Sequence, residues 1–280
     1  MKKVPRVACI NDISGFGRCS LTSAIAILSV CSVQPCPLPT AVLSRHTGFP
    51  EYFFKAFTDS MPAYLDNWSD LDFDGIYSGF LGSERQISIV LDYIKARLEK
   101  QKKPPIVLVD TVMGDGGRPY STYTRAMCEK MKTLAQYADI ITPNITEACI
   151  LTSTEYTGEQ LTDEQTHTLL LKLAELGSRS VVITGVHRGD NILNVTYDNG
   201  SFFESSVHCI SRTFSGTGDL FASVVCAAVL NGFPLEEASD IAGRFVHMAA
   251  RYTVDAHTPV SEGVIFEPLL CSLAQMLSNG

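Results

Sequence analysis

The sequence predicts a three-layer α/β fold, in which a mostly parallel central β-sheet lies between two layers of helices. Apolar runs of strand length alternate along the chain with stretches whose apolar residues recur at helical spacing. Several expected strands end in polar, glycine-rich sequence. One glycine turn, Gly216-Thr217-Gly218-Asp219, opens directly into a helix-like stretch. Such alternation is typical of a parallel sheet that is covered by helices on both faces.

The expected strands are short and mostly apolar, as strands buried on both faces are. They cover residues 6–10, 34–42 (with interrupting prolines), 75–78, 105–109, 139–142 and 180–184. Asn199-Gly200 is a hairpin turn signal and predicts two further strands at 192–197 and 201–207. The carboxyl ends of the parallel strands are expected at one edge of the sheet, where ligands of such folds bind.

Helices are expected between these strands, and several carry start signals. Ser83 is an N-cap residue type that precedes apolar residues at helical spacing. Thr162 and Gln165 form a capping-box sequence for a helix that stops near Gly177. Further helices are expected at 20–32, from Asp219, from Leu235 and near the C-terminus. No linker or repeat divides these elements, so residues 1–280 are expected to form a single domain.

The composition is that of an ordinary globular protein and excludes several classes of partner. Of the 280 residues, 45% are hydrophobic, and the formal net charge is −8. No run of lysine and arginine exceeds a pair, so neither nucleic acid nor an anionic membrane surface is expected as a partner. No apolar run approaches the ~18 residues that span a membrane. The N-terminus lacks a signal-type apolar stretch.

The nine cysteines are scattered, and no CxxC pair is present. This spacing argues against a zinc centre or a redox motif. Reduced and mostly buried thiols are therefore expected, together with a cytoplasmic location.

The segment Gly216-Thr217-Gly218-Asp219 predicts an anion site. A glycine turn that opens a helix leaves backbone N–H groups and the positive end of the helix dipole available to an anion. A carboxylate in that place would repel a phosphate unless it had a chemical role. We therefore interpret Asp219 as a base beside a transferable phosphoryl group.

Three further carboxylates, those of Asp110, Asp115 and Glu147, follow expected strands at the same sheet edge. Carboxylate oxygens are usual ligands of Mg²⁺, often through its waters. Phosphoryl transfer needs such a metal against the nucleotide phosphates. The trio therefore predicts a magnesium site, and the alternative is that these acids are turn and helix-terminus residues.

Several motifs together resemble the ribokinase-like superfamily of kinases. Gly216–Asp219 resembles its anion-hole and catalytic-aspartate motif, and Asn144-x-x-Glu147 matches its NxxE motif. Within that superfamily the chain looks like the pyridoxal kinase branch, whose DPVMGD, SNHTG and ITPN segments have counterparts here. These are Asp110-x-Val112-Met113-Gly114-Asp115, Ser44-x-His46-Thr47-Gly48 and Ile140-Ile141-Thr142-Pro143-Asn144.

The chain also departs from the pyridoxal kinase pattern. Thr111 stands where that branch usually has proline, and Arg45 where it has asparagine. The segment 11–17 looks as much like that of hydroxymethylpyrimidine kinases, so that activity is the alternative, alone or as a second activity. Hydroxymethylpyrimidine kinases typically carry GTGC rather than GTGD, so Asp219 favours a vitamin B6 kinase.

By this resemblance the γ-phosphoryl group of ATP would pass to the 5′-hydroxymethyl group of pyridoxal, pyridoxine or pyridoxamine. The resemblance implies catalytic roles for Asp219, Gly216, Thr217 and Gly218. It implies ATP contacts by Asp110, Asn144, Thr184, Gly185, Thr217 and Tyr123. It implies Mg²⁺ ligands, direct or through water, among Asp110, Asp115, Glu147 and Thr142.

The resemblance also implies the remaining partners. Substrate contacts are implied for Asp12, Ser14, Thr47, His46, Phe80 and Asp219, although His46 equally suits a packing role. A monovalent cation, K⁺ or Na⁺, and a homodimer are implied as well. The sequence leaves the preferred vitamer open.

Three other classes of protein fit the sequence less well. Sugar and nucleoside kinases of the superfamily usually carry an N-terminal GG-type motif and a β-strand lid, and neither is clear here. A non-catalytic ligand sensor is expected to lose the base or the acidic trio, and all four carboxylates are kept. A dinucleotide-binding oxidoreductase is disfavoured because Gly15-x-Gly17 lacks the third glycine of GxGxxG.

Overall fold

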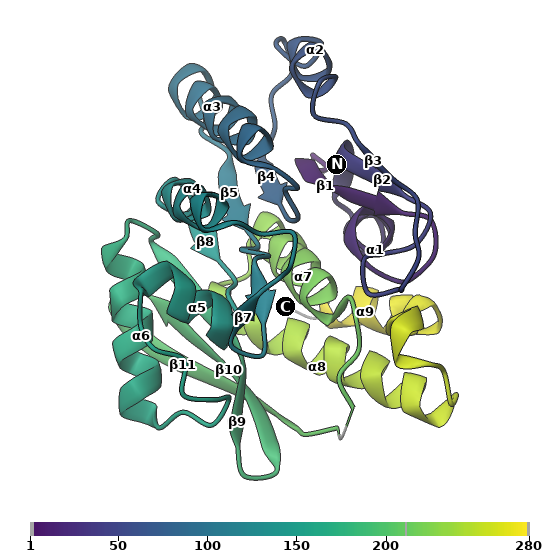
Figure 1. The fold of residues 1–280 in the computed structure, drawn as a ribbon, viewed down its shortest axis with the longest axis vertical. Helices are drawn as coiled ribbons and strands as arrows, with labels where there is room; N and C mark the ends of the chain where they lie inside the picture. Colours follow the sequence, from purple (N-terminus) through teal and green to yellow (C-terminus); the bar gives the residue numbers. More distant parts are fainter. Residues whose placement is uncertain (1–2, 211, 279–280) are drawn as a thin grey trace.

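The computed structural model describes residues 3–210 and 212–278, and a large mixed sheet is its central feature (Figure 1). In this described part, nine strands follow the order β11-β10-β9-β8-β5-β4-β1-β2-β3. Their bounds are β1 Arg6–Ser14, β2 Gln34–Leu43, β3 Phe54–Ala56, β4 Gly75–Ser78, β5 Ile106–Val109, β8 Ile140–Ile141, β9 Ser180–Arg188, β10 Asn191–Asp198 and β11 Ser201–His208. The strands from β9 to β2 pair in parallel, whereas β10, β11 and β3 pair antiparallel at the two sides.

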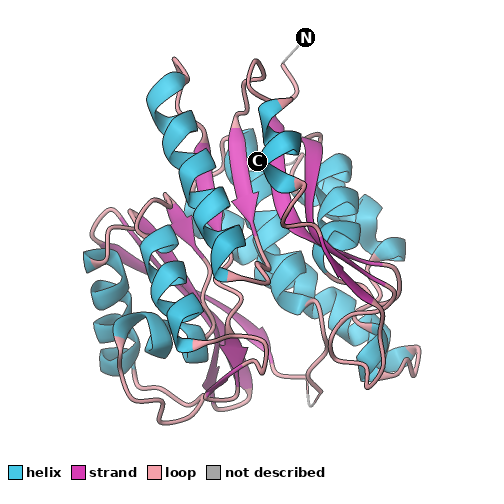
Figure 2. Ribbon diagram, turned by 45° about the horizontal axis from the view of Figure 1, so that its top comes forward, coloured by secondary structure: helices cyan, strands magenta, loops and turns pink. Residues whose placement is uncertain are grey.

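Two layers of helices cover the sheet, as Figures 1 and 2 show. One layer contains α3 (Glu84–Lys100), α4 (Arg125–Ala135), α5 (Ile145–Thr152) and α6 (Asp163–Glu175), with the short α2 (Met61–Asp66) beyond them. The other contains α1 (Ser20–Val30), α7 (Thr217–Asn231), α8 (Leu235–Asp255) and α9 (Leu270–Met276). The three-layer α/β fold predicted from the sequence is therefore confirmed.

Alternate side chains of the central strands pack against the two layers of helices. In β1, Ala8 and Ile10 join the core under α3–α6, and Val7 and Cys9 join the core under α1, α7 and α8. All four are completely buried. Successive side chains of a strand point to opposite faces. A continuous apolar run therefore indicates a strand that is covered by helices on both faces.

The local start signals act as predicted. Ser83 accepts a hydrogen bond from the Gln86 N–H at the start of α3, and Thr162 and Gln165 form both bonds of a capping box at α6. The Asn199-Gly200 turn joins β10 to β11. The predicted strands and helices are all present, with ends that move by a few residues.

The prolines of β2 lie where a strand tolerates them. The Gln34 N–H faces β1 and bonds the Pro5 carbonyl, so Pro35, Pro37 and Pro39 alternate with it and face away from β1. The outer neighbour, β3, pairs only with Ala41–Leu43. The missing N–H groups therefore cost no ladder bond, as expected for proline at a sheet edge.

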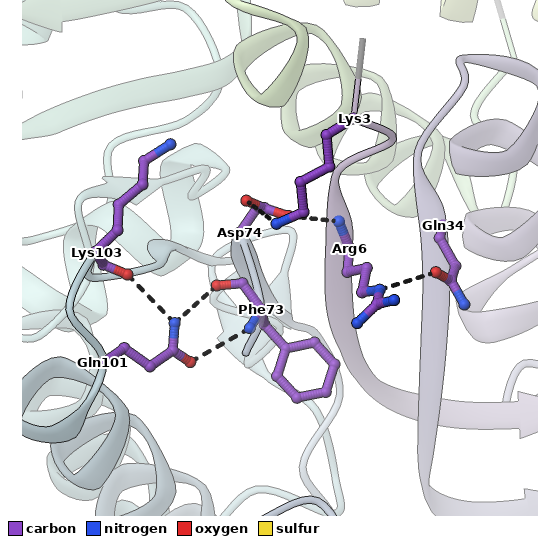
Figure 3. Close-up of polar contacts among 7 residues, drawn as sticks. All are labelled: Lys3, Arg6, Gln34, Phe73, Asp74, Gln101 and Lys103. Carbon is purple, nitrogen blue, oxygen red and sulfur yellow. Dashed lines mark hydrogen bonds and ion pairs between the residues drawn. The ribbon is translucent and has the colours of Figure 1, made fainter. Parts of the chain in front are cut away.

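The amino ends of the strands are tied by polar side chains (Figure 3). Asp74, just before β4, accepts the Arg6 backbone N–H at 2.9 Å and pairs with the Lys3 Nζ at 3.4 Å. Gln101 accepts the Phe73 N–H and donates to the Phe73 carbonyl, which joins the end of α3 to the start of β4. These contacts fix the sheet at the edge opposite the polar strand ends.

Some elements were not predicted. They are α2, α4, α5, the edge strand β3 and a small hairpin of β6 (Gly114–Asp115) and β7 (Arg118–Pro119), together with the 3₁₀ turns Val260–Glu262 and Glu267–Leu269. The first strand also runs on through the polar residues to Ser14. No helix in the described ranges has the length and apolar character needed to cross a membrane.

Candidate active site

The polar strand ends meet at one edge of the sheet, against the N-terminus of α7. Asn11 follows the apolar part of β1, and the Gly79 N–H continues β4 by bonding the Ile10 carbonyl. The Asp110 N–H, just after β5, bonds the Ser78 carbonyl. Thr142 follows β8 and bonds the Val109 carbonyl through its N–H. The topology therefore brings these four segments together, as predicted from the parallel strand order.

Gly216 sets the position of α7 against the start of α1. Its φ is +83°, and a Cβ built on it would lie 2.0 Å from the Arg18 carbonyl oxygen. Only glycine can adopt this positive φ while lying so close to the Arg18 carbonyl. As the N-cap of α7 it supplies no side-chain acceptor, so the backbone N–H groups of the first turn form the candidate anion cradle.

The Asp219 carboxylate lies in the first turn of α7, where it is partly shielded from solvent. Its Oδ1 accepts a hydrogen bond from the Asn11 Nδ2 at 3.1 Å. Burial raises the pKa of Asp219 to about 6, a net value that includes an opposing hydrogen bond from the Ser20 N–H, a further rise from the Asp12 charge and an opposing hydrogen bond from Asn11. A carboxylate with a pKa near neutrality is suited to accept a proton at physiological pH.

Asn11 is the residue that holds this arrangement together, and the sequence did not single it out by role. Its side chain is buried, and its Oδ1 accepts from the Asp12 N–H and from the Phe80 N–H, both at 2.9 Å. With the bond to Asp219, one amide joins β1, the end of β4 and α7. A Cβ on Gly79 would lie 2.3 Å from the Asn11 Nδ2, so that glycine makes room for the amide.

Asp12 and Ser14 form a buried polar cluster beside Asp219. The Asp12 carboxylate accepts from the Ser14 hydroxyl at 2.9 Å and from the Ser20 hydroxyl at 2.6 Å. Burial raises the pKa of Asp12, and these two bonds oppose that rise. The predicted substrate residues of the first strand therefore lie next to the predicted base.

Asp110 lies beside Gly218 at the α7 N-terminus. Its Oδ1 accepts from the Thr142 hydroxyl at 3.2 Å, and its Oδ2 would lie 4.0 Å from a Cβ on Gly218. Burial, reinforced by the charge of Asp219, raises the pKa of Asp110 to about 7. The carboxylate therefore faces the anion cradle with one oxygen held by Thr142.

Glu147 is fully engaged by the protein. Its carboxylate accepts from the Met113 N–H at 3.0 Å, from the Thr111 hydroxyl at 3.2 Å and from the Asn144 N–H at 3.1 Å. Asn144 and Glu147 form the two bonds of a capping box for α5. Burial and the neighbouring Asp110 hold the pKa of Glu147 well above its usual range. The threonine that departs from the family pattern is thus a direct partner of Glu147.

The structure does not bring Asp115 into contact with the other two acids of the predicted trio. Asp115 is exposed in β6, and its Oδ1 accepts the Gly116 N–H. Among the described residues, no three acidic, histidine or cysteine side chains gather in a metal-binding arrangement. Asp110 and Glu147 are therefore the two acids that lie together.

Several other predicted residues lie around this centre. Thr184 bonds the Pro143 carbonyl and bridges Asn144, so the end of β9 lies beside the start of α5. Gly185 has φ +78° with open space around its Cα. Tyr123 is buried, and its ring lies edge-on to Phe80 with centroids 6.4 Å apart.

His46 anchors the loop that carries Thr47. Its Nδ1 accepts the Gly48 N–H at 3.1 Å, and its Nε2 lies 2.7 Å from the Ser261 carbonyl oxygen. The ring is therefore the Nε2–H tautomer, and both of its nitrogens have partners within the protein. Thr47 itself is exposed. The histidine thus positions the loop, in line with the packing role that the sequence left open.

A family model for phosphomethylpyrimidine kinase matches residues 19–262. The chain belongs to the phosphomethylpyrimidine kinase family. Its members are kinases, which transfer phosphoryl groups. Among curated relatives, the bifunctional thiamine biosynthesis protein ThiED of Geobacter sulfurreducens is 30% identical over 66% of the chain, which spans 36% of that protein. The pyridoxal kinase PdxY of Pseudomonas aeruginosa is 23% identical, with 88% of each chain covered.

Solved structures of the family superpose closely on this chain. A Bacteroides thetaiotaomicron protein, provisionally named a phosphomethylpyrimidine kinase, has a TM-score of 0.93 at 36% identity over 97% of this chain and 94% of its own. A second crystal form of it, solved with pyridoxal, has a TM-score of 0.91 at 37% identity over 97% and 96%. Pyridoxal kinase from Lactobacillus plantarum has a TM-score of 0.89 at 28% identity over 99% of both chains. The resemblance inferred from the motifs is therefore confirmed.

Replacing Gly216 by alanine should displace the anion cradle. The new Cβ would collide with the Arg18 carbonyl, and the positive φ adds strain, so we expect a loss of about 2–4 kcal/mol in the free energy of unfolding. Gly200→Ala is the matched control, because Gly200 has φ +85° with open space around it and should lose only about 1–2 kcal/mol. Urea denaturation measures both, and equal losses would contradict the close approach.

Replacing Asp110 by asparagine should stabilise the protein at high pH. The raised pKa means that the folded chain binds this proton more tightly than the unfolded chain, so stability falls as pH rises from about 4 to 7. The asparagine side chain would still accept from Thr142 without carrying charge. We expect a gain of up to about 4 kcal/mol at pH 8 that vanishes near pH 4, measured by urea denaturation without divalent cations. Asp92→Asn, at an exposed site on α3, is the control, and a gain independent of pH would contradict the prediction.

Proposed function

We propose that this protein is a vitamin B6 kinase, which transfers the γ-phosphoryl group of ATP to the 5′-hydroxymethyl group of pyridoxal, pyridoxine or pyridoxamine. The observation that carries the proposal is the Asp219 carboxylate. It lies in the first turn of α7 above an uncapped row of N–H groups, is held by Asn11, and has a pKa of about 6. A base beside an anion cradle is the arrangement that phosphorylation of an alcohol requires.

The relatives support pyridoxal as the acceptor. The Bacteroides thetaiotaomicron relative was crystallised with pyridoxal, and three other relatives are named pyridoxal kinases. The chain also keeps aspartate, rather than cysteine, at the end of its GTGD motif. Together these features favour a pyridine over a pyrimidine alcohol.

In the proposed mechanism, the substrate hydroxyl gives its proton to the Asp219 carboxylate as its oxygen attacks the γ-phosphorus. The new O–P bond forms while the bond to the β-phosphate oxygen breaks, and ADP leaves. The N–H groups of residues 216–219 stabilise the charge on the moving phosphoryl group. Asn11 keeps the accepting carboxylate in place, and Asp12 and Ser14 line the side from which the substrate approaches.

The acids beside the cradle suit a magnesium ion. Asp110 has one oxygen held by Thr142 and the other directed at the α7 N-terminus, so it is the proposed direct ligand. The oxygens of Glu147 already accept three hydrogen bonds, so Glu147 and the exposed Asp115 are proposed to act through metal-bound water. When bound, Mg²⁺ neutralises phosphate charge. Protein oxygens of Thr142 and Thr184 are the proposed contacts for a monovalent cation.

The remaining assignments follow from position. We propose that Asn144, Thr184 and Gly185 contact the ATP phosphates, since they adjoin each other at the ends of β8 and β9. Thr217 lies in the cradle itself. Phe80 and Thr47 are proposed to flank the substrate ring. Tyr123 is proposed to lie on the nucleotide side, with the edge of its ring against Phe80.

Hydroxymethylpyrimidine kinase is the second candidate, alone or as an additional activity. The family model carries that description, and a relative from Aquifex aeolicus with this name is 28% identical over 66% of the chain. A kinase assay with ATP and each of pyridoxal, pyridoxine, pyridoxamine and hydroxymethylpyrimidine separates the two. Preference for a B6 vitamer in kcat/KM supports the first proposal, and exclusive turnover of the pyrimidine would overturn it.

Replacing Asp219 by asparagine should remove the proton acceptor and keep the shape of the site. We expect kcat to fall by a factor of about 10²–10⁴, while the affinity for ATP, measured by calorimetry, stays within about twofold. Asp92→Asn should leave both unchanged. Turnover close to that of the wild type would show that Asp219 is not the base.

Replacing Asn11 by alanine should move the acid limb of the pH–rate profile. The amide stabilises the charged form of Asp219, so its loss raises the pKa of that carboxyl above about 6, and activity is lost at a higher pH than in the wild type. The profile of kcat/KM against pH measures this shift. In an Asp219→Asn background the same substitution should leave the pH profile unchanged. An unchanged acid limb in the Asn11→Ala single variant would refute the proposed interaction between Asn11 and the charge of Asp219.

A further inference from the structure

Ser20 begins α1 in a backbone conformation that a serine rarely adopts. Its φ is +54°, in the left-handed region that disfavours residues with a Cβ. The other non-glycine residues of the described chain with positive φ lie just past the end of a helix or in the β10–β11 turn, where that region is usual; they are Ser32, Ser153, Asn199 and His257. Ser20 alone has positive φ at the start of a helix, and such strain persists where the surrounding structure imposes it.

The Ser20 side chain does not cap the helix that it begins. A serine at a helix start usually accepts a hydrogen bond from an N–H group of its own helix, but α1 has no side-chain cap bond. The Ser20 hydroxyl instead donates to the Asp12 Oδ1 at 2.6 Å. Ser20 is 7% exposed, so this bond between α1 and β1 is made away from water.

The backbone of Ser20 faces the proposed base. Its N–H, the first of α1, donates a hydrogen bond to the Asp219 carboxylate on α7. The positive end of the α1 dipole therefore lies beside that carboxylate, in addition to the N-terminus of α7. The first turn of α1 contains no acidic residue, so Asp12 and Asp219 supply the negative charge at this helix start.

Ser20 and Asn11 each join the two carboxylates. Asn11 accepts the Asp12 N–H at 2.9 Å and donates to Asp219 at 3.1 Å. Ser20 donates its hydroxyl to Asp12 and its N–H to Asp219. Because the two negative charges repel each other, their side chains keep this spacing only while donors hold both of them. The spacing is therefore set by α1 as well as by β1.

We propose that Ser20 is a positioning residue, which holds Asp12 and Asp219 at a fixed spacing so that the alcohol is oriented beside the first and deprotonated by the second. The inference rests on the proposed function, in which Asp12 lines the substrate side and Asp219 is the base. A small displacement of a reacting group costs a large part of the rate. The strained backbone is therefore kept for the reaction rather than for stability.

Ser20→Gly removes the hydroxyl and keeps the backbone. Glycine adopts positive φ without strain and retains the N–H, so the bond to Asp12 is lost alone. That bond opposes the rise that burial causes in the pKa of Asp12. Without it the pKa rises further, so the variant loses extra stability as the pH rises. Relative to the wild type, we expect its unfolding constant in urea denaturation to be about tenfold larger at pH 8 than at pH 4.

The other titratable groups around Asp12 stay unchanged in this variant. They are Asp219 on α7, Cys19 before α1 and His46 after β2. In an Asp12→Asn background, Ser20→Gly should lose its pH dependence, because no charge remains for the hydroxyl to hold.

Ser153→Gly is the matched control for the backbone. Ser153 has the same φ of +54° at an exposed site past α5, so the effect of this substitution on stability should not depend on pH. An effect of Ser20→Gly that is equal at pH 4 and pH 8 would overturn the contact with charged Asp12. This comparison does not depend on which alcohol the protein phosphorylates.

Kinetics test whether the spacing serves the reaction. We expect Ser20→Gly to lower kcat/KM for the alcohol by about tenfold to a hundredfold, while KM for ATP stays within about twofold. A merely structural role would affect both substrates alike. The alcohol is the one that the wild type phosphorylates fastest, so a wild type inactive on B6 vitamers counts against the proposed function and not against Ser20. Equal kcat/KM values for variant and wild type would overturn the positioning role.

Discussion

The hydrogen bond between Asn11 and Asp219 is the contact on which the site depends. It joins residues 208 positions apart, and the same amide also holds the N–H groups of Asp12 and Phe80. An amide has two donors and an acceptor oxygen with two lone pairs, and here three neighbours use them at once. The amide therefore fixes the ends of β1 and β4 relative to the first turn of α7, and it holds the proposed base in the same arrangement.

The site gathers negative charge where the protein is least able to solvate it. Asp12, Asp110, Glu147 and Asp219 all have pKa values raised by burial. Each is retained by hydrogen bonds from the ends of strands and helices rather than by a basic partner. Such an arrangement costs folding stability above neutral pH. It also suits the proposed function, because negatively charged carboxylates bind a divalent cation and accept the proton of the substrate hydroxyl.

Local patterns predicted most of the fold, and long-range contacts explain what they missed. The strands that are buried on both faces and the helix caps at Ser83 and Thr162 depend on a few adjacent residues, so the sequence is enough to predict them. The residues of the candidate site were predicted because they follow strands that end at one edge and because their motifs resemble those of a known family. Asn11 was missed as the central partner because its role exists only once α7 is folded against β1. Asp115 was grouped with the other acids because sequence order cannot show that a β-hairpin carries its side chain to the surface.

The prolines of β2 limit which strands can pair with the outer side of the sheet, both during folding and afterwards. They are Pro35, Pro37 and Pro39. The three-residue β3 pairs with only the last part of β2, and an unpaired strand edge is a template for aggregation. Three prolines that face outward leave alternate positions there without a donor. A misdirected chain therefore finds no regular ladder along most of this edge. Regular pairing on this side of β2 is therefore left to Ala41–Leu43, which β3 already occupies.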